Sequence, residues 1–346
     1  MPIGSHTILP GFLLLQLKRI GDAVLTAPAL AALRAAYPDT TLTLVLSGAA
    51  GALAGLFGMV DEVLVWQPGR LNPGLLHRVR ELGADVVLDY TGTDRSAFLS
   101  LLSGAPLRVG YEKFASGWLR RWAWPFRSGA SVQAWHTIDF HHALASPLGL
   151  TLPPVGDAGH LKLPATMELP ALPAPYILIH PGTAREDKFW PPEHWIALLQ
   201  HLHGQHGLPI VLTGGDWAYE RQHIRQILAG SPVPVTDLRG QLNLAAWAGV
   251  IAGARLAITV DTAAMHVAAA FEVPQLGLFG PTNAYHWAPR HPQSIIRRAG
   301  VPDGLSLQPK QRGAAMPLLP WQSVAAAADI LLTSPRRIDA PEQEVE

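Results

Sequence analysis

Residues 12–46 read FLLLQLKRIGDAVLTAPALAALRAAYPDTTLTLVL, and this stretch decides the fold of the N-terminal half. An apolar run, a polar loop, an Ala- and Leu-rich stretch and a second apolar run follow one another. The pattern predicts a strand, a loop, a helix and a strand at residues 12–17, 18–22, 23–37 and 42–46. Because apolar runs at 62–66 and 86–88 extend this βαβ unit, we expect a parallel sheet with helices on both faces.

The same alternation returns after a Pro-rich stretch at residues 149–175, which is the predicted linker. Strands are predicted at 176–180, 209–213, 256–260 and 275–279, and helices at 191–203, 219–228, 244–253 and from 264. The fold class is therefore α/β, with two Rossmann-like domains and a ligand cleft between them at the carboxyl ends of the strands. We expect the N-terminal domain at 1–160, the C-terminal domain at 161–335 and an acidic tail at 336–346.

Length and composition limit the class of protein. At about 150 residues per domain, 346 residues correspond to two domains, and 49% hydrophobic against 15% charged residues indicates large cores. The formal net charge of zero argues against a nucleic-acid partner. The absence of cysteine excludes disulfides, thiolate metal sites and cysteine nucleophiles. Since no apolar run reaches the ~18 residues of a membrane span and no secretory leader is recognisable, we expect a cytoplasmic protein.

The first loop that can carry chemistry is Arg19-Ile20-Gly21-Asp22, which leads from a predicted strand to a predicted helix. Loops at this point of doubly wound sheets contact ligands. Gly21 permits a tight turn or the close approach of a substrate. Two interpretations of Asp22 remain open from the residues alone. Its side chain caps the helix, or its carboxylate accepts a proton from a sugar hydroxyl during attack.

A second loop runs from His180 to Pro191 and also connects a strand to a helix. Its Gly182, Thr183 and Lys188 could surround an anionic group near the positive end of that helix. The alternative is a surface loop on which Lys188 is solvated.

A third loop, Asp261-Thr262-Ala263-Ala264-Met265-His266, has the same position after a strand. The backbone amides of Thr262 to Met265 suit a phosphate or diphosphate. His266 is expected in the first helical turn, where a buried, hydrogen-bonded histidine is the alternative to a catalytic one.

Several motifs of other enzyme classes are absent from the sequence. It contains no strict G-x-G-x-x-G, which argues against a Rossmann oxidoreductase, and no G-x-x-x-x-G-K-[ST] or G-x-S-x-G. Its histidines form no H-E-x-x-H, so we do not expect a catalytic metal.

Five motifs, in this order, resemble glycosyltransferase family 9, the ADP-heptose:lipopolysaccharide heptosyltransferases. They are LQLKRIGDAVLTAPAL at 15–30, His180-Pro181-Gly182-Thr183, Lys188-Phe189-Trp190-Pro191, Gly214-Gly215-Asp216, and Asp261 to His266 continued by Leu278-Phe279-Gly280-Pro281-Thr282. Two pairs differ from the family pattern: Lys18-Arg19 stands where Ser-Ser is common, and Ala263-Ala264 where a Gly-led pair is frequent.

The resemblance implies a GT-B fold, with the acceptor on the N-terminal domain and the nucleotide-sugar donor on the C-terminal domain. It also implies an inverting transfer that needs neither a metal nor another cofactor. Asp22 then corresponds to the general base and Lys188 to the ligand of the donor phosphates. The other residues implied in donor binding are Thr183, Gly214, Gly215, Glu220, Asp261, Thr262, Ala263, Ala264 and His266, with Glu220 on the nucleotide ribose.

On this resemblance we expect a transfer of heptose from ADP-heptose to the inner core of lipopolysaccharide. A protein-serine heptosyltransferase of the same family and a non-catalytic nucleotide-sugar binding module are the alternatives. Between residues 95 and 127 there are six basic side chains and one acidic one, in the presumed acceptor domain. This charge suits a phosphorylated lipid acceptor and contact with the cytoplasmic face of the inner membrane, with an ordinary solvated face as the alternative. The candidate acceptor ligands are Arg19, Arg95, Lys113 and Arg120.

Overall fold

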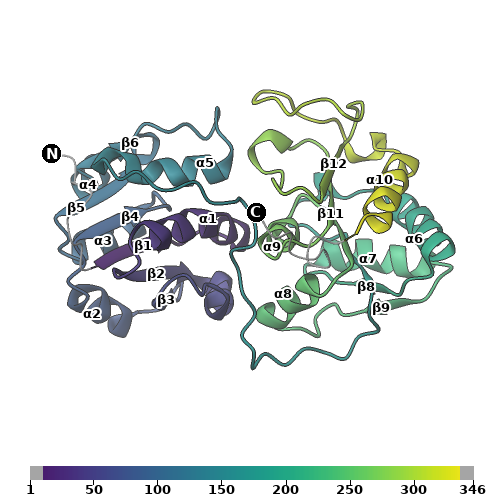
Figure 1. The fold of residues 1–346 in the computed structure, drawn as a ribbon, viewed down its shortest axis with the longest axis horizontal. Coiled ribbons are helices and arrows are strands. Elements are labelled where there is room, and N and C mark those ends of the chain that lie inside the picture. Colours follow the sequence, from purple (N-terminus) through teal and green to yellow (C-terminus); the bar gives the residue numbers. More distant parts are fainter. Residues whose placement is uncertain (1–10, 336–346) are drawn as a thin grey trace, which may run out of the picture. The chain divides into compact units, whose positions relative to one another are not determined.

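The computed structural model describes residues 11–335. The chain divides into two compact units, Met1–Ala165 and Thr166–Glu346, and the division falls inside the predicted Pro-rich linker (Figure 1). The acidic tail predicted at 336–346 lies outside the described residues. None of the helices within residues 11–335 is long and apolar enough to cross a membrane.

Unit 1 contains a six-stranded sheet in the order β3-β2-β1-β4-β5-β6, in which all neighbours are parallel. Its strands are β1 (Gly11–Gln16), β2 (Thr41–Ser47), β3 (Glu62–Trp66), β4 (Val86–Asp89), β5 (Leu107–Tyr111) and β6 (Phe126–Ser128). Its α-helices are α1 (Ile20–Ala36), α2 (Pro73–Glu81), α3 (Asp94–Leu102), α4 (Trp118–Ala123) and α5 (Thr137–His142). Short 3-10 helices lie at Gly48–Leu56, Glu112–Phe114 and Ala143–Leu148.

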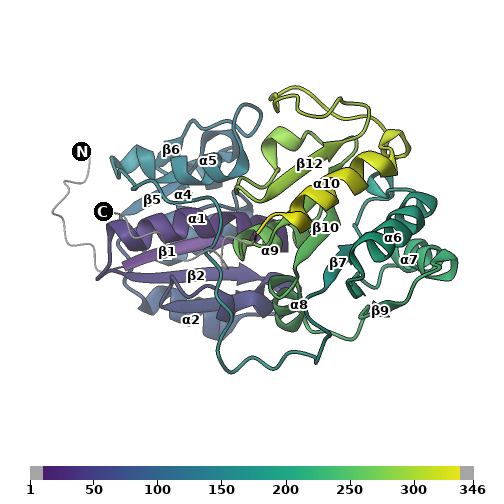
Figure 2. The same cartoon turned by 45° about the vertical axis from the view of Figure 1, so that its right-hand side comes forward.

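Unit 2 contains a second six-stranded sheet, in the order β12-β11-β10-β7-β8-β9 and again fully parallel. Its strands are β7 (Ile177–His180), β8 (Ile210–Leu212), β9 (Val235–Asp237), β10 (Leu256–Val260), β11 (Gln275–Phe279) and β12 (Ser294–Arg298). Its α-helices are α6 (Pro192–His206), α7 (Ala218–Gly230), α8 (Leu244–Ala252), α9 (Ala263–Ala270) and α10 (Trp321–Thr333). Short 3-10 helices lie at Glu186–Lys188, Ala284–His286 and Met316–Leu318, and α10 lies alongside α6 (Figure 2).

The two sheets have the same topology, because in each the first strand lies at the centre and the order reverses beside it. The reversal falls between β1 and β4 in unit 1 and between β7 and β10 in unit 2. This is the strand order of a Rossmann domain, in which ligands bind at the carboxyl ends of the strands beside the reversal. The prediction of two Rossmann-like domains is confirmed.

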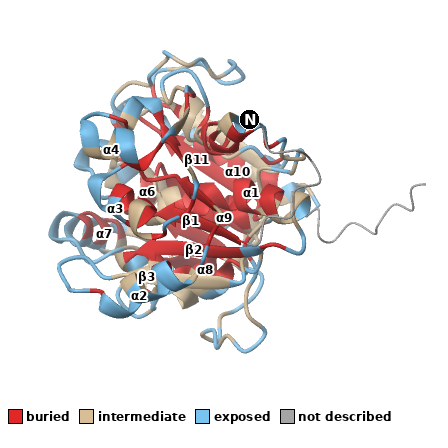
Figure 3. Ribbon diagram, turned by 90° about the vertical axis from the view of Figure 1, so that its left-hand side faces the viewer, coloured by how far each residue is buried: buried red, intermediate tan, exposed pale blue. Residues whose placement is uncertain are grey.

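The central strands are mostly apolar because they are covered on both faces. All residues of β1, β10 and β11 are buried, and Figure 3 shows the strands β1 and β2 in the colour of buried residues. Helix α1 packs on this core through small residues, with Ala23, Ala27 and Ala29 among its buried positions. Close helix packing of this kind fixes the position of the polar first turn of α1.

One predicted boundary is wrong in a way that matters for the site. The helix expected from residue 23 begins at Ile20, so Asp22 lies in its first turn and not in a preceding loop. Two buried polar side chains stabilise the earlier start: the Thr26 hydroxyl donates to the Asp22 carbonyl oxygen (2.8 Å), and the Gln16 side-chain amide donates to the same oxygen (3.4 Å).

The segment between the two units contains no helix or strand from residue 149 to 176. Its first part is tied to unit 1, since the Lys162 amide donates to the Leu56 carbonyl oxygen at 3.1 Å. Its last part belongs to unit 2, because the Leu169 side chain packs so closely on Gly249 that a Cβ there would lie 2.4 Å from Leu169 Cδ2.

Candidate functional site

Asp22 lies in the first turn of α1, the helix that follows β1, and β1 is one of the two strands beside the reversal of strand order in unit 1. The Asp22 carboxylate is half-buried, and burial raises its pKa above that of an exposed aspartate, while the positive charges of Lys18 and Arg19 oppose the rise. A carboxylate with a raised pKa is a stronger base than a solvated one, provided that it is ionised. The N-cap of α1 is Arg19, and no side chain caps this helix.

A buried network of polar side chains packs against the first turn of α1. The Gln16 amide donates to the Thr26 hydroxyl oxygen (2.7 Å), and this hydroxyl lies 3.1 Å from Nδ1 of His141 in α5. Burial lowers the pKa of His141 to about 3, so the imidazole is neutral at physiological pH. This network therefore holds the backbone of Asp22 in place, and it adds no charged side chain next to the Asp22 carboxylate.

A second loop, after β4, lies beside the β1 loop. The Thr91 hydroxyl donates to the Leu15 carbonyl oxygen (3.1 Å) and accepts from the Leu17 amide (2.8 Å), which ties the two loops together. Oδ1 of Asp89 accepts from the amides of Thr91 (2.8 Å) and Gly92 (3.0 Å). Asp89 is fully buried, and burial raises its pKa to about 6 against the opposing effect of these amides.

The four candidate acceptor ligands lie in different surroundings. Arg19 is exposed and acts on Asp22 by its charge, and Lys113 Nζ lies 5.8 Å from the centroid of the Phe114 ring. Arg120 is engaged within the fold, because its Nε donates to Asp94 Oδ1 at 2.6 Å. Arg95 is exposed, and its guanidinium carbon lies 5.7 Å from the centroid of the Trp66 ring. The described contacts do not bring these four side chains into one cluster.

In unit 2, Lys188 and Asp261 form an ion pair between the loops that follow β7 and β10, the two strands on either side of the reversal of strand order. Lys188 lies in the 3-10 helix after β7, and Asp261 directly follows β10. Lys188 Nζ donates to Asp261 Oδ2 at 2.6 Å and to the Asp261 carbonyl oxygen at 3.4 Å. Both side chains are largely buried, with exposed fractions of 15% and 8%. Two residues after Lys188, the buried Trp190 anchors the same loop, because its indole nitrogen donates to the Leu319 carbonyl oxygen at 2.9 Å.

The start of α9 lies next to this ion pair. Thr262 is the extended N-cap residue, and Ala263 and Ala264 open the helix. The Met265 amide already donates to the Thr262 carbonyl oxygen at 3.2 Å. Since the first amides of an α-helix have no acceptor within it, the amides of Thr262, Ala263 and Ala264 can bind an anion. The Met265 amide, the last of the predicted run, is already bonded within the turn.

His266 stands in the first turn of α9 and is buried. Desolvation lowers its pKa to about 4, and the charge of Lys188 acts in the same direction while that of Asp261 opposes it. Among residues 11–335 its Nδ1 has no hydrogen-bond partner. His266 is thus a neutral imidazole with a free ring nitrogen beside the Lys188–Asp261 pair.

Glu220 joins two further loops of unit 2. It lies in the first turn of α7, and its Oε1 accepts from the Gly215 amide at 2.5 Å. The same oxygen approaches Gly182 so closely that a Cβ there would lie 1.7 Å away, and a Cβ at Gly214 would lie 2.4 Å from Ile224 Cδ1. Burial raises the pKa of Glu220, the Gly215 amide lowers it, and Asp216 raises it further.

Thr183 is buried in the same loop as Gly182. The strand before it ends in His180, whose Nδ1 lies 2.9 Å from the Thr213 hydroxyl. Within unit 2, the structure therefore brings the predicted donor residues together around the ends of β7, β8 and β10.

Sequence reasoning missed Asp89, Thr91 and Phe114 as neighbours of the Asp22 loop. Lys18 Nζ lies 5.1 Å from the centroid of the Phe114 ring, and a Cβ at Gly92 would lie 2.3 Å from the same ring. A signal was present, because Asp89 is the polar end of an apolar run and Thr91-Gly92 follow it. The strand predicted at 86–88 extends one residue further in the structure, so that Asp89 is its last residue.

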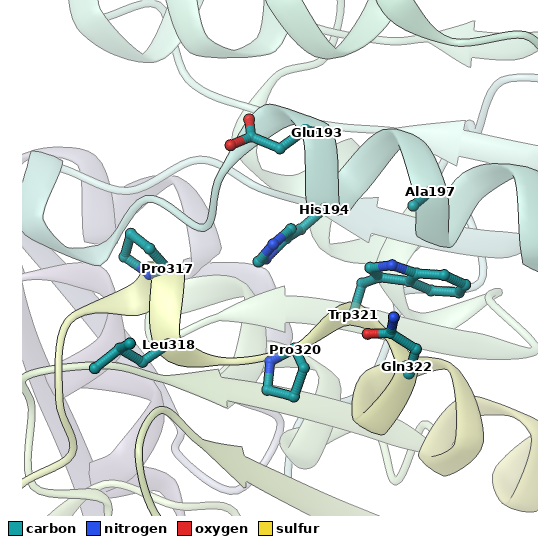
Figure 4. A pocket seen from close by; sticks show the side chains of 8 residues that line it. All are labelled: Glu193, His194, Ala197, Pro317, Leu318, Pro320, Trp321 and Gln322. Atoms are coloured by element: carbon teal, nitrogen blue, oxygen red, sulfur yellow. The ribbon is translucent and has the colours of Figure 1, made fainter.

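A surface hollow of about 610 Å³ lies elsewhere on unit 2, between α6 and the segment that leads into α10 (Figure 4). It contains none of the predicted site residues. It is lined by His194 and Ala197 of α6 and, opposite them, by Pro317, Leu318, Pro320 and Trp321. Within residues 11–335, no group of three or more His, Cys, Asp or Glu side chains is arranged to hold a metal ion.

Comparison with known proteins gives consistent matches. The profile described as glycosyltransferase family 9 (heptosyltransferase) matches residues 74–309. The chain is 31% identical over 289 residues to lipopolysaccharide heptosyltransferase 1 of Pseudomonas aeruginosa, covering 78% of this chain and 79% of the relative. It is 25% identical over 338 residues to lipopolysaccharide heptosyltransferase 3 of Escherichia coli, covering 91% and 97%.

A solved structure described as E. coli ADP-heptose lps heptosyltransferase II superposes with a TM-score of 0.75 at 22% identity, covering 93% of this chain and 98% of the other. At this level of identity the likeness concerns the fold. The chain therefore has the GT-B fold, with two Rossmann-like domains, that its sequence predicts.

Proposed function

The chain belongs to glycosyltransferase family 9 (heptosyltransferase), and on this premise we propose that it transfers a heptose from ADP-heptose to the inner core of lipopolysaccharide. The names of its relatives support lipopolysaccharide as the acceptor. The description of the superposed E. coli structure supports ADP-heptose as the donor. In this proposal unit 1 binds the acceptor and unit 2 binds the donor.

The reaction is a single displacement that inverts the anomeric carbon. Asp22 removes the proton from an acceptor hydroxyl, and the oxygen of that hydroxyl forms a bond to the anomeric carbon. The bond from this carbon to the diphosphate oxygen breaks, and ADP leaves with the electron pair. The raised pKa of Asp22 supports its role as base, because it brings the basicity of the carboxylate closer to that of the hydroxyl.

Lys188 and the start of α9 stabilise the negative charge that grows on ADP. Lys188 offers its ammonium group, and Ala263 and Ala264 offer backbone amides at the positive end of the helix. Asp261 orients Lys188 through the 2.6 Å ion pair, and Thr262 and His266 offer polar groups to the sugar and diphosphate. Prearranged donors of this kind typically contribute ~3 to 4 kcal/mol each to the stability of the transition state. The step requires no metal ion.

The nucleotide is bound by the loops that Glu220 joins. One oxygen of Glu220 is held by the Gly215 amide, so the other can accept hydrogen bonds from the ribose hydroxyls. Gly182, Gly214 and Gly215 leave room for this carboxylate and for its helix, and Thr183 stands beside them.

The acceptor is a phosphorylated lipid at the cytoplasmic face of the inner membrane. Exposed Arg19 and Lys113 are available to its anionic groups, whereas Arg120 first has to leave its ion pair with Asp94. We therefore assign Arg120 a smaller part in acceptor binding than Arg19, Arg95 and Lys113.

The observation that carries the proposal is the half-buried Asp22 carboxylate at the reversal of strand order in unit 1. The test is the Asp22→Asn variant, which keeps the size of the side chain and removes its basicity. We expect transfer from ADP-heptose to a defined core acceptor to fall by ~100-fold or more in kcat, with unchanged affinity for ADP. The matched control is Asp39→Asn, which removes an exposed carboxylate from the loop after α1.

Mass spectrometry of the products separates the proposal from its alternatives. Heptose found on a serine-rich protein, and none on the lipid acceptor, would assign the chain to protein glycosylation. Binding of ADP-heptose with no transfer to either acceptor would make it a binding module. Near-normal turnover of Asp22→Asn would exclude Asp22 as the base.

A further inference from the structure

Helix α4 presents two large aromatic side chains to solvent. Trp118 and Trp122 have exposed fractions of 77% and 63%. They are separated by four positions, so they lie on the same face of the helix. Exposed indole surface of this size is unfavourable in water unless it has a partner. The sequence contains three tryptophans here, and only Trp124 is buried.

The exposure does not result from a loosely attached helix. Ala123 and Trp124 are buried in a small core with Ala97 of α3. A Cβ at Gly110 would lie 2.4 Å from Trp124 Cδ2, so this glycine makes room for the buried indole. The Arg108 side chain holds the end of α4, with Nε donating to the Ala123 carbonyl oxygen at 2.9 Å. The fold therefore fixes α4 with both other tryptophans outward, and Figure 3 shows α4 largely in the colour of exposed residues.

Cationic side chains accompany the two indoles. Arg121 lies between them on α4, with an exposed fraction of 57% and only a long contact of 3.7 Å to Glu112. Over residues 94–127 there are six basic and two acidic side chains, a net charge of +4. Tryptophan together with exposed arginine is the combination that binds the headgroup region of anionic bilayers.

This surface is continuous with the loops around Asp22. The Arg120 Nη1 donates to the Phe114 carbonyl oxygen at 3.3 Å, and the Phe114 ring packs on Gly92. Lys18, four residues before Asp22, lies over the same ring. A lipid-anchored acceptor held at α4 would therefore have its headgroup near the acceptor side of unit 1.

We propose that Trp118, Arg121 and Trp122, the α4 surface, dock the protein on an anionic lipid bilayer. The purpose of this docking, access to a lipid acceptor, rests on the proposed function. The exposed aromatic and basic side chains that support it are observed independently of the reaction. A net positive surface favours a bilayer rich in negative headgroups over a second copy of this chain, which would carry the same charge.

The test measures co-sedimentation of the full chain with phosphatidylcholine vesicles that contain or lack phosphatidylglycerol. We expect binding to the anionic vesicles, at least about tenfold weaker binding for the double variant Trp118→Ala/Trp122→Ala, and about fivefold weaker binding for Arg121→Ala. Added salt should reduce the effect of Arg121 and leave that of the tryptophans. The matched controls in the same unit are Leu71→Ala and Arg80→Ala, which remove an exposed apolar and an exposed basic side chain away from α4.

Because both tryptophans are exposed, the melting temperature of the double variant should equal that of the parent, which excludes unfolding as the cause. The variants should also keep full transfer to a water-soluble acceptor fragment. Failure of transfer in all proteins, with vesicle binding intact, would overturn the proposed function alone. Three results would overturn the proposal that the α4 surface docks on a bilayer. They are equal vesicle binding by the parent and the double variant, no vesicle binding by the parent, and a concentration-dependent dimerisation of the parent that the double variant abolishes.

Discussion

Lys188 Nζ and Asp261 Oδ2 lie 2.6 Å apart and join the loops after β7 and β10, the two strands between which the order of the second sheet reverses. The pair has a structural and a chemical consequence. It closes the gap between two loops that are far apart in sequence. It also holds an ammonium group beside the first amides of α9, where a diphosphate can use both.

Replacing Lys188 by Met should therefore affect activity and stability together. The unpaired, buried Asp261 carboxylate should destabilise the protein by about 3 to 5 kcal/mol, and kcat/KM for transfer should fall by ~100-fold or more. The double variant Lys188→Met/Asp261→Asn should regain much of the stability, measured by urea unfolding, without regaining transfer. Recovery of transfer in the double variant would contradict the role of Lys188 in charge stabilisation. Lys310→Met, at an exposed position of the same unit, is the control.

The pH dependence of transfer should reflect the surroundings of Asp22. The base acts when ionised, so activity should rise with pH through the pKa of Asp22, which burial raises above that of an exposed aspartate. The charge of Lys18 lowers this pKa. Lys18→Met should accordingly move the acid limb of kcat/KM to higher pH, whereas Lys162→Met, at an exposed lysine of the same unit, should not. A limb that stays in place or moves to lower pH speaks against Asp22 as the titrating base.

Gly182 should tolerate no side chain. A Cβ there would lie 1.7 Å from Glu220 Oε1, so Gly182→Ala should displace the carboxylate and break its bond to the Gly215 amide. We expect destabilisation of about 1 to 3 kcal/mol and about tenfold weaker binding of ADP, measured by thermal unfolding and calorimetric titration. Gly204→Ala in α6 meets no atom within 4 Å and should be neutral or slightly stabilising. An unchanged affinity of Gly182→Ala for ADP would contradict the role of Glu220 in nucleotide binding.

Asp89 should make stability depend on pH. Its pKa is about 6 in the folded protein against 3.8 for the ordinary group, so between these values the folded state holds a proton that the unfolded state has lost. The free energy of unfolding then falls as pH rises through this window, by about 3 kcal/mol in total. Asp89→Asn keeps an oxygen for the amides of Thr91 and Gly92 and should lose this dependence. If the parent and variant differ equally at pH 4 and pH 8, Asp89 does not titrate in this way.

Much of the fold could be predicted because the buried strands are almost purely apolar. The strands at 62–66, 256–260 and 275–279 have the predicted boundaries. Strands β5, β6, β9 and β12 were missed because they are short or carry charged residues, as in Leu107–Tyr111 with Arg108. Helix α4 was missed for a similar reason, since its six residues hold too few turns to show a period.

The candidate site divides in the same way. Residues in one loop, such as Asp261 and Thr262, could be recognised from their order in the sequence. Contacts between loops could not be predicted, because the approach of Glu220 to Gly182 and the tie between Thr91 and Leu17 depend on which strands become neighbours. The basic stretch at 95–127 shows the same limit: its charge was visible, but not that Arg108 holds carbonyl oxygens inside the fold.

Among residues 11–335 the chain passes once from one sheet to the other, and this has an evolutionary consequence. Each sheet is completed by strands from its own half, and the connecting segment is bound to unit 1 at Lys162 and to unit 2 at Leu169. Recombination between genes of this family at the codons for residues 165–166 would therefore exchange whole sheets and sever no strand pairing. Lineages could vary the two halves separately, and chimaeras joined at this point would reveal which half determines each choice of substrate.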